Sequence, residues 1–495
     1  MQFDPTNFTI AAPLLALAAG ALVILLLDLI LPARRAQASW YVVAVGAAIT
    51  AGYYLVPLWK GDMVSGFFGA MIMDRFAVVF SAVLIVTVLL TVLLSMTRSE
   101  EDKSGYLALV LWGGMGMMLM VSAGSLMTIF LGLELLSLAL YVAVAFDPRH
   151  PNAREAALKY FVLGSVASAF ILFGFALVYG VTGSMSLAEI ATAAAPTALY
   201  YKVGIALTLV GFGFKLALVP FHAWAPDVYQ GAPTPITAFM SVGTKAAAFA
   251  VAARFLMAAV PSVWAGSYLL PLTILAAASM LLGSTVGIWQ NDLKRLMAYS
   301  GIAHAGYLIM AVAGLGAEGM SAAAYYMAAY MFTAMGVFAI VTLLENEGEE
   351  GSSFEALSGL FYRRPALGAA MAVFMFALVG LPPTGGFLGK FLLAKSAVGA
   401  IATVPTNAWV LLIALMVSTG ISAYVYLRVI GVCFKKPAEG ALPKARMMGA
   451  QGDDLALSSG AVRFGVLTVL VIALVGTLVM GVLPGPVVDL LKVTF

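Results

Sequence analysis

The stretch Pro220-Phe-His-Ala-Trp-Ala-Pro226 lies at the end of an apolar run that begins near residue 200. A helix needs about 20 mainly apolar residues to span the hydrocarbon core of a bilayer, so this run predicts a membrane-spanning helix. Proline inside a helix removes a hydrogen bond and clashes with the preceding turn. In a membrane, backbone freed in this way survives only where protein or water covers it. The stretch therefore predicts a broken helix next to a protected site.

The composition of the whole chain is that of a membrane protein. Of 495 residues, 10% are charged and 63% are apolar, and the mean hydropathy is +1.03. A soluble domain of this length carries far more surface charge. Spanning backbone must satisfy its own hydrogen bonds, so the apolar runs are predicted to be helices, and the short alternating strands of a barrel are not seen. We predict an all-α integral membrane protein.

The apolar runs define about fourteen transmembrane helices, each close to the length that a bilayer requires. The predicted spans are residues 8–31, 39–58, 72–96, 106–122, 125–146, 155–180, 200–226, 236–259, 268–289, 296–315, 321–344, 366–398, 406–433 and 463–484. The longest polar stretches, 345–365 and 434–462, are too short to be domains. We therefore predict a single membrane domain, 1–495.

Lysine and arginine are concentrated in alternate loops. One set of loops carries Arg34, Arg35, Arg98, Lys103, Arg149, Arg154, Lys294, Arg295, Arg363, Arg364, Lys435, Lys436, Lys444, Arg446 and Arg463. The other set, with both termini, carries little beyond Lys60, Arg75, Lys202 and Lys492. Because positive residues favour the cytoplasmic side, both termini are predicted on the outer side, with an even number of spans. The first span lacks a basic leader and a cleavage site, so we expect it to be retained.

A second break, Leu381-Pro-Pro-Thr-Gly-Gly386, falls in the twelfth span, five spans after the first. This spacing predicts two five-helix units, spans 4–8 at 106–259 and spans 9–13 at 268–433. Spans 1–3 at 8–96 and the last span at 463–484 lie outside them. Because five is odd, the second unit would be inverted relative to the first, which is typical of ion-coupled transporters. The alternative is that both breaks are ordinary proline kinks.

Five ionisable side chains fall well inside the predicted spans, namely Glu134, Lys215, Lys245, His304 and Lys390. A charge near the bilayer centre costs about 2.5–3.5 kcal/mol on insertion scales, so such groups face a partner or a water-filled path. Burial lowers the pKa of a lysine and a nearby carboxylate raises it, so a buried lysine can load and release a proton near neutral pH. These residues predict a path for protons or cations.

Three of these residues belong to the first unit. Glu134 is the only acid deep in a span, so it is the natural partner of a lysine, either in a relay or in a static ion pair. Lys215 precedes the first break by about a turn and a half, and His222 would share its face if the helix continued. Lys245 follows Ser241 at helical spacing, which predicts either a proton site or a polar packing seam.

The second unit carries similar candidates. His304 follows Ser300 on one helix face and is either part of a path or a histidine satisfied by packing. Lys390 directly follows the second break. Near the end of the sixth span, Lys159 lies four residues after Glu155, so it is either a path residue or half of an interfacial pair.

Other charged and polar positions have weaker interpretations. Asp74, Arg75, Lys202, Arg254 and Lys395 are predicted to be interfacial anchors. Arg428 is expected to meet an acid of a neighbouring subunit or a lipid head group. Glu134, Lys215 and Lys245 are matched in the second unit by His304, Lys390 and Tyr424, at separations of about 170–180 residues.

Several classes of function are excluded. With Cys433 as the sole cysteine, the chain alone cannot hold an iron–sulfur cluster, which needs about four, or form an internal disulfide. No Gly-rich loop follows a strand, so nucleotide binding is not supported. The basic residues flank spans, so they do not indicate nucleic acid. We predict no cofactor or metal in this chain.

The segment Lys215-Leu-Ala-Leu-Val-Pro-Phe-His-Ala-Trp-Ala-Pro-Asp227 resembles the signature of the antiporter-like subunits of respiratory complex I and of the multisubunit Na⁺/H⁺ antiporters. The similarity covers nearly the whole chain. The fourteen-helix length and Gly386-Phe-Leu-Gly-Lys390 resemble one branch of the complex I chains, in which this lysine is not replaced by glutamate. By this resemblance Glu134 and Lys215 form a coupled pair, Lys245 is the central link, Lys390 is the exit-side lysine, and Lys159 and His304 are wires.

The resemblance also implies the setting. It implies a proton-translocating subunit of a bacterial NADH–quinone oxidoreductase in the inner (plasma) membrane, beside other antiporter-like subunits, small subunits and lipids. Flavin mononucleotide and iron–sulfur clusters would belong to other subunits, and quinone to the complex as a whole. A cation antiporter subunit is the alternative reading. A purely structural subunit is a third, which would not need costly buried lysines.

Overall fold

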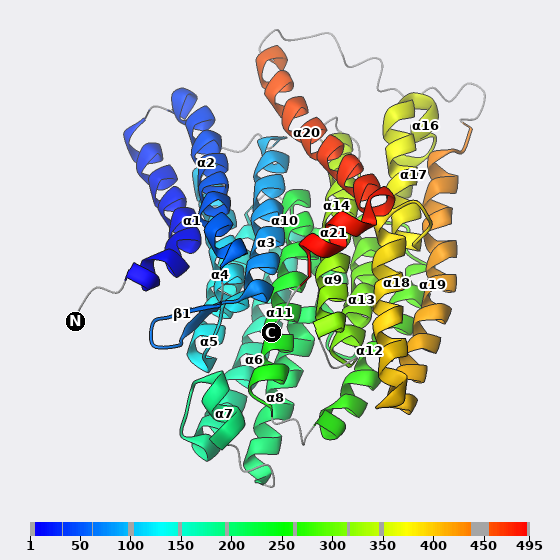
Figure 1. Cartoon of the computed structure of the whole chain (residues 1–495). Coiled ribbons are helices and arrows are strands. Elements are labelled where there is room, and N and C mark those ends of the chain that lie inside the picture. Colours follow the sequence, from blue (N-terminus) through cyan, green and yellow to red (C-terminus); the bar gives the residue numbers. More distant parts are fainter. Residues whose placement is uncertain are drawn as a thin grey trace.

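The computed structural model is nearly all helical (Figure 1) and describes residues 5–31, 33–61, 63–97, 103–146, 151–193, 198–260, 265–313, 317–345, 351–436 and 455–492. Within these ranges, thirteen helices are long and apolar enough to cross a membrane. The helix α13 (Leu293–Ala313), which carries Lys294 and Arg295 in its first turn, lies where the tenth span was predicted. The predicted all-α membrane fold is confirmed.

The N-terminal part is built from three long helices and a small hairpin. Its elements are α1 (Pro5–Ile30), α2 (Ala33–Lys60), β1 (Val64–Gly66), β2 (Met71–Met73), α3 (Arg75–Leu94) and the 3₁₀ turn η1 (Ser95–Thr97). The strands pair antiparallel, with Val64 opposite Met73. Asp74 caps α3 by accepting a hydrogen bond of 2.8 Å from the Ala77 amide, as is usual for an acid at a helix N-terminus.

The remaining helices follow in chain order. The next group comprises α4 (Lys103–Val121), α5 (Leu126–Val144), α6 (Pro151–Thr182), α7 (Leu187–Ala193), α8 (Leu199–Leu216), α9 (Trp224–Gly231), α10 (Thr234–Phe239), the π-helical η2 (Met240–Thr244) and α11 (Lys245–Ala258). After α12 (Ala265–Gly287) and α13 come α14 (Ala317–Glu345), α15 (Phe354–Leu357), α16 (Leu360–Arg363), α17 (Pro365–Val379), α18 (Gly385–Gly399), η4 (Ala400–Ala402), α19 (Pro405–Cys433), α20 (Leu455–Val482) and α21 (Pro484–Leu490).

Both predicted helix breaks are present and begin in the same way. The helix α8 stops at Ala217, which is left-handed with φ 57°, and the Leu218 amide bonds back to the Gly213 carbonyl at 2.8 Å. The helix α17 stops at Gly380, with φ 89°, and Leu381 bonds back to Phe376 at 3.0 Å. This paired arrangement satisfies the last carbonyls of a helix. The chain resumes as α9 and α18, so spans seven and twelve are broken helices.

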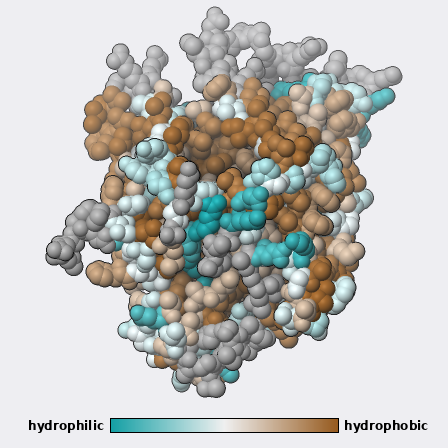
Figure 2. Space-filling view, in the orientation of Figure 1, coloured by the Kyte–Doolittle hydropathy of each residue, from teal (hydrophilic) through white to brown (hydrophobic). Residues whose placement is uncertain are grey.

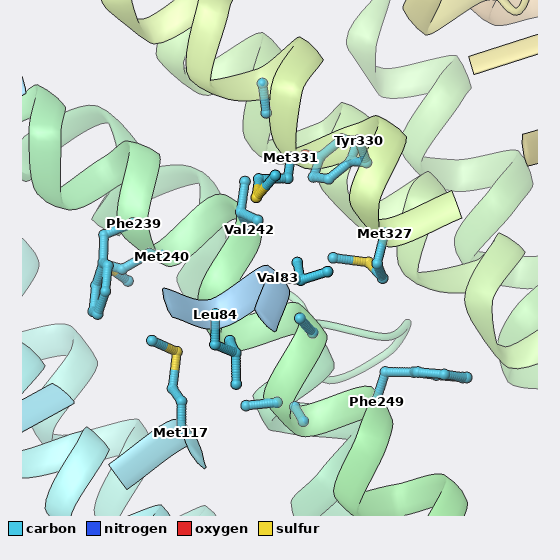
Figure 3. Packing of buried hydrophobic residues seen from close by; sticks show 14 of the residues in the cluster. Val83, Leu84, Met117, Phe239, Met240, Val242, Phe249, Met327, Tyr330 and Met331 are labelled. Atoms are coloured by element: carbon cyan, nitrogen blue, oxygen red, sulfur yellow. The ribbon is translucent and has the colours of Figure 1, made fainter. Parts of the chain in front are cut away.

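The centre of the molecule is formed by α10, η2, α11 and α14, whose side chains are nearly all buried. In Figure 3, Phe239 and Met240 pack near Met117 of α4, while Met327 of α14 lies near Val83 of α3. Large apolar side chains elsewhere point outward, among them Leu29, 84% exposed, and Met416, 74% exposed. Figure 2 shows such apolar surface around hydrophilic residues near the C-terminal end. An apolar exterior is what a bilayer or neighbouring membrane helices would cover.

The connections between the long helices lie at opposite ends of the bundle (Figure 1). At the hairpin end, the Phe67 amide donates to Asn7 Oδ1 at 2.6 Å and Arg75 donates to the Leu490 carbonyl at 2.7 Å, so each end of the described chain is bound near the hairpin. At the opposite end, the Gly359 amide binds the Val432 carbonyl at 3.1 Å. Most of the predicted polar stretch 434–462 lies outside the described residues.

This arrangement leads to a labelling prediction. With the sole cysteine Cys433 buried, Ala445→Cys is expected to react only with reagents supplied from the cytoplasmic side, because lysine and arginine cluster in its loop. Met185→Cys, at the hairpin end, is expected to react from the outer side. The measurement is blocking by a membrane-impermeant maleimide in cells and in inverted vesicles. If the impermeant maleimide blocked Ala445→Cys only when it was added from the outer face, the predicted orientation would be wrong.

Candidate functional site

Lys215 lies in the last turn of α8, beside the first break, and its side chain is buried. Its Nζ donates a hydrogen bond of 2.7 Å to Ser137 Oγ on α5. Glu134 lies one turn before Ser137, and its charge acts on Lys215. No ion pair within 4.0 Å joins the two among the described residues, and Glu134 Oε1 is buried without a protein hydrogen-bond partner. The structure brings Lys215 against α5, the helix that carries Glu134, and Ser137 of that helix makes the direct contact.

Lys245 begins α11, directly after the π-helical turn η2, and is 2% exposed. π-helical turns inside α-helices are frequent at functional sites. The Lys245 Nζ donates a hydrogen bond of 2.6 Å to Tyr229 Oη on α9. On its other side lies Gly301 of α13, where a Cβ atom would come within 2.6 Å of Nζ. Ser241 donates to its own helix backbone instead of contacting the lysine.

His304 of α13 lies between two lysines. Lys245 and Lys390 both act electrostatically on its imidazole. The ring is held by the Tyr326 hydroxyl at Nδ1 and by the Tyr426 hydroxyl, 3.4 Å from Nε2. Both ring nitrogens of His304 therefore have hydroxyl partners, as one interpretation predicts. His304 also lies in the row of buried ionisable residues formed with Lys215, Lys245 and Lys390, as a relay requires.

Lys390 lies in the second turn of α18, just after the second break. Its Nζ donates to the carbonyls of Leu378 and Val379 at 2.9 and 3.0 Å, which are the last carbonyls of α17. A cation at this place neutralises the negative end of the helix dipole. Beside it, a cavity of about 10 Å³ is lined by Lys390, His304 and Tyr330 among others, which is close to the room that one water needs.

Lys159 lies outside this buried row. Its side chain is 42% exposed and forms the predicted ion pair with Glu155 at 2.8 Å. A second pair, with Asp227 at 2.7 Å, was not predicted. Arg295 of α13 also binds Asp227 at 2.7 Å. Burial alone would raise the pKa of Asp227, but the hydrogen bonds from Lys159 and Arg295 hold this pKa below its usual value. These groups surround a polar cleft of about 220 Å³ that also includes Gln230.

His222 lies in the irregular segment between α8 and α9 and is half-buried. In the part of the chain that the structure describes, no hydrogen bond or ion pair joins its side chain to Lys215. The helix α8 stops at Leu216, so Lys215 and His222 do not share a helix face as they would in an unbroken helix. The structure does not bring His222 into the row.

Three charged residues that were predicted to anchor the protein at the interface, or to reach outward, bind this chain. Arg254 is 4% exposed and donates two hydrogen bonds, of 2.7 and 2.8 Å, to the Asp74 carboxylate. Arg75 donates to the carbonyls of Trp59 and Leu490. Arg428 donates to the Ile288 carbonyl at 2.5 Å at the end of α12. Arg254 is therefore not an interfacial anchor, because it is buried against the Asp74 carboxylate, whereas the anchor role of Arg75 and the outside partner of Arg428 stay predictions.

The predicted match between Lys245 in the first unit and Tyr424 in the second unit was also wrong. Tyr424 is 59% exposed and faces away from the site. Tyr426, two residues later, is buried and binds Ser300 Oγ at 2.6 Å. A helix turns about 100° per residue, so two residues reverse the face that a side chain occupies.

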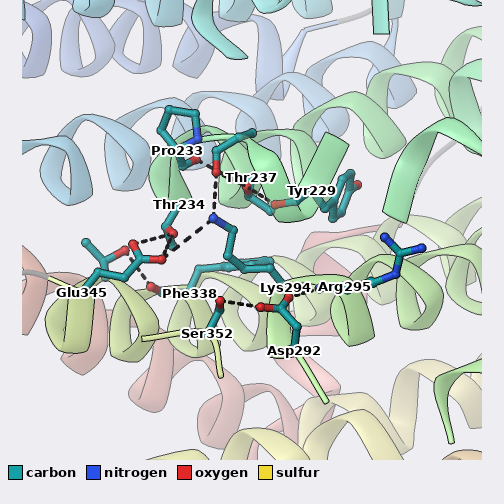
Figure 4. A network of polar contacts seen from close by, with 12 residues as sticks. Tyr229, Pro233, Thr234, Thr237, Asp292, Lys294, Arg295, Phe338, Glu345 and Ser352 are labelled. Carbon is teal, nitrogen blue, oxygen red and sulfur yellow. Dashed lines mark hydrogen bonds and ion pairs between the residues drawn. The ribbon is translucent and has the colours of Figure 1, made fainter. Parts of the chain in front are cut away.

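Further polar groups that sequence reasoning missed lie around α9 and α10. Figure 4 shows Lys294 of α13 beside the α9–α10 connection, where its Nζ donates to the Ala232 carbonyl at 2.7 Å. Glu345 of α14 accepts a hydrogen bond from Thr234 at 2.6 Å and lies 3.9 Å from Lys294. Tyr229, which contacts Lys245, follows the signature by two residues, and this adjacency was the available signal.

The Arg254–Asp74 pair leads to a stability prediction. Arg254→Met is expected to destabilise the protein by about 3–5 kcal/mol, because it leaves a buried carboxylate without its cation. Adding Asp74→Asn removes that charge while an amide oxygen can still cap α3, so most of the stability is expected to return. Thermal unfolding of the detergent-solubilised protein measures both. The exposed Lys395–Glu318 pair is the control, since Lys395→Met is expected to cost about 0–1 kcal/mol. Equal losses in single and double variants would contradict this account.

Membrane-spanning helices with two broken members and a buried row of ionisable side chains define an ion-translocating membrane protein. The family model described as "NADH:quinone oxidoreductase/Mrp antiporter, TM" matches residues 123–422. The chain belongs to this family.

Relatives extend the likeness over the whole length. A protein of Symbiobacterium thermophilum named "NADH-quinone oxidoreductase subunit N 1" is 60% identical over 98% of each chain. A chain in the structure titled "Respiratory complex I from Thermus thermophilus with bound Aureothin" is 33% identical, with a TM-score of 0.78 over 97% of this chain and all of that one. A chain of the Mrp complex from Dietzia, 21% identical, shares the fold with a TM-score of 0.74, covering 99% of this chain and 100% of that one.

Proposed function

We propose that this chain is subunit N of an NADH–quinone oxidoreductase and moves protons across the membrane through Glu134, Lys215, Lys245, His304 and Lys390. The observation that carries the proposal is the position of His304 on α13, one turn after Gly301, which Lys245 Nζ approaches, and beside Lys390 in one small cavity. Full-length likeness to proteins with that name supports the assignment. As a subunit, the chain would contribute to an enzymatic translocase without itself binding NADH.

The contacts suggest how a proton would travel. Ser137 accepts a hydrogen bond from Lys215, and a carboxylate at Glu134 would favour the protonated lysine against the effect of burial. Lys245 is held by Tyr229, and it can pass a proton toward His304 across the space that Gly301 leaves. Lys390 receives it beside the carbonyl end of α17, where a positive charge is favoured. Lys159 and Asp227 would form the polar mouth of the path, and His222 would line the break.

We also infer that the two five-helix units, 106–259 and 268–433, are inverted repeats with spans 1–3 and the last span outside them. The same hydrogen-bond pattern at Ala217 and Gly380 supports this, since both broken helices stop alike. An odd number of helices in each unit then reverses its direction in the membrane.

The setting belongs to the same proposal. The protein would lie in the bacterial plasma membrane with both termini on the outer side, beside other antiporter-like and small subunits and lipids. Flavin mononucleotide and iron–sulfur clusters would be held by other subunits, and quinone would bind at the level of the complex.

Co-purification tests the proposal. Affinity purification of the chain from its native membrane is expected to recover flavin, iron–sulfur proteins and NADH-dependent quinone reductase activity, and vesicles holding the complex should acidify when NADH is added. Recovery of Na⁺/H⁺ exchange without flavin or quinone reductase would overturn it in favour of a cation antiporter, the other branch named in the family description.

A further inference from the structure

We infer that the Tyr229 hydroxyl is a proton-transfer group between Lys215 and Lys245, which rests on the proposed proton path and adds a residue to it. Tyr229 is 1% exposed, and its Oη accepts the 2.6 Å hydrogen bond from Lys245 Nζ. This is the shortest hydrogen bond that any of the three buried lysines in the row makes. The contact joins the second half of the broken helix directly to the central lysine.

Aromatic contacts link the Tyr229 ring to the chain next to Lys215. The ring of Tyr229 meets the edge of Trp224, with centroids 6.5 Å apart. Trp224 in turn stacks on Phe214, at 5.3 Å, and donates its indole N–H to the Phe214 carbonyl at 2.9 Å. Phe214 directly precedes Lys215 in the chain. An aromatic wall of Phe214, Trp224 and Tyr229 therefore runs from Lys215, whose Nζ lies 5.9 Å from the centroid of the Phe214 ring, to Tyr229, which contacts Lys245.

Polar atoms are nevertheless present along this wall. Tyr141 Oη and Glu134 Oε1 are buried near Lys215 and have no hydrogen-bond partner in the protein. Buried polar atoms of this kind are usually satisfied by water, which can carry a proton from Lys215 along the wall. Among the described residues, the hydrogen bond recorded for the Tyr229 hydroxyl is the one from Lys245, and no carboxylate is recorded as bonded to it.

The half-helix α9 that carries Tyr229 is fixed at several points. Asp227 is bound by Lys159 and Arg295, each at 2.7 Å. The carbonyl of Tyr229 itself accepts a hydrogen bond of 2.9 Å from Thr237. At the end of α9, Lys294 holds the Ala232 carbonyl. The hydroxyl is thus held at one position against Lys245, which proton transfer requires.

During the transfer, the Tyr229 hydroxyl gains one proton and loses another. A proton that leaves the Lys215 ammonium and moves through water forms a new bond to Tyr229 Oη. The original phenolic proton leaves Oη at the same time and bonds to the lone pair of neutral Lys245 Nζ. Lys215 becomes neutral and Lys245 becomes charged, while Tyr229 is unchanged and nothing is oxidised or reduced. A tyrosine hydroxyl can both donate and accept, as this step needs.

The test uses Tyr229→Phe in the complete complex, assayed as NADH-driven proton pumping in inverted vesicles. Phenylalanine keeps the ring packing and removes the hydroxyl, so pumping is expected to fall at least about fivefold, within what a positioned proton-transfer group contributes. Incorporation of 3-fluorotyrosine at position 229 restores a more acidic hydroxyl. It is expected to restore pumping with a shifted pH profile, which a purely structural hydroxyl would not produce.

Tyr201→Phe is the matched control, because Tyr201 is equally buried but donates to the Ala259 carbonyl at 2.9 Å, away from the lysines. It is expected to pump at the parental rate. Parental pumping by Tyr229→Phe, with Lys245→Met inactive, would overturn the role of Tyr229 and leave the proposed function standing. If Lys245→Met and Lys215→Ala also pump normally, the proposed path itself fails. Rescue by 3-fluorotyrosine without any shift in pH profile would reduce Tyr229 to a packing contact and overturn the inference.

Discussion

Lys215→Ala is expected to reduce proton pumping to about a tenth or less of the parental rate while assembly stays nearly intact. The lysine is buried at the end of α8 and its ammonium contacts Ser137. Alanine removes the titratable group but also the cost of burying a charge, so folding is not expected to suffer. Pumping in vesicles and the amount of assembled complex on a native gel measure the two effects separately.

Alanine variants of three other lysines provide comparisons for the pumping rate of Lys215→Ala. Lys390→Ala is expected to behave like Lys215→Ala, because it removes the charged group at the second break. Lys159→Ala is expected to be milder, since this lysine is exposed and its role in holding Asp227 is shared with Arg295. Lys395→Ala is the control, because it removes an exposed lysine paired with Glu318. Assembly of Lys215→Ala with undiminished pumping would mean that this lysine is only structural.

The helices and their breaks could be predicted from the sequence because each depends on local chemistry. Apolar runs of sufficient length must be helical in a membrane, and proline interrupts them wherever they occur. Both Pro220 and Pro383 therefore marked real breaks. The buried lysines were found for a similar reason, since a charge inside an apolar run is conspicuous without any knowledge of its neighbours.

Partners across the fold could not be predicted in the same way. Position along a span indicates depth, but it does not indicate which helix a side chain faces. Arg254 was expected to reach the surface because arginine usually does so, yet it meets Asp74 across the bundle at a site 180 residues away in the chain. Tyr229 was missed because a phenol carries no charge and so does not stand out in an apolar run.

The Glu134–Lys215 pair could be predicted only in part from the sequence. The sequence placed a single deep acid and a lysine in the same unit, and the structure brings the lysine against α5, the helix that carries the acid. Ser137 was not predicted, although it lies on the same face of α5 three residues after Glu134. The acid therefore acts on the lysine at a distance, while the serine hydroxyl makes the hydrogen bond.

Glu134→Gln is expected to slow proton loading at Lys215 near neutral pH, because it removes the negative charge that favours the protonated lysine. We expect pumping to fall several-fold, on the order of 1 kcal/mol in the barrier. Glu134→Asp should do less harm, since the charge remains and only one methylene is lost. Ser137→Ala tests the contact itself, because it removes the acceptor of the Lys215 hydrogen bond but keeps the acid.

The combination Glu134→Gln with Lys215→Met decides whether the two residues act together. If the acid works only through the lysine, it has no further effect once the lysine is gone, and the double variant should lose little more than Lys215→Met alone. Residues within one network show interaction energies of about 0.5–3 kcal/mol in such cycles. Pumping rates of the parent, both single variants and the double variant, measured in reconstituted vesicles, give this coupling energy. Losses that add in free energy would show that Glu134 and Lys215 act independently, and Glu134 would then need a partner elsewhere in the complex.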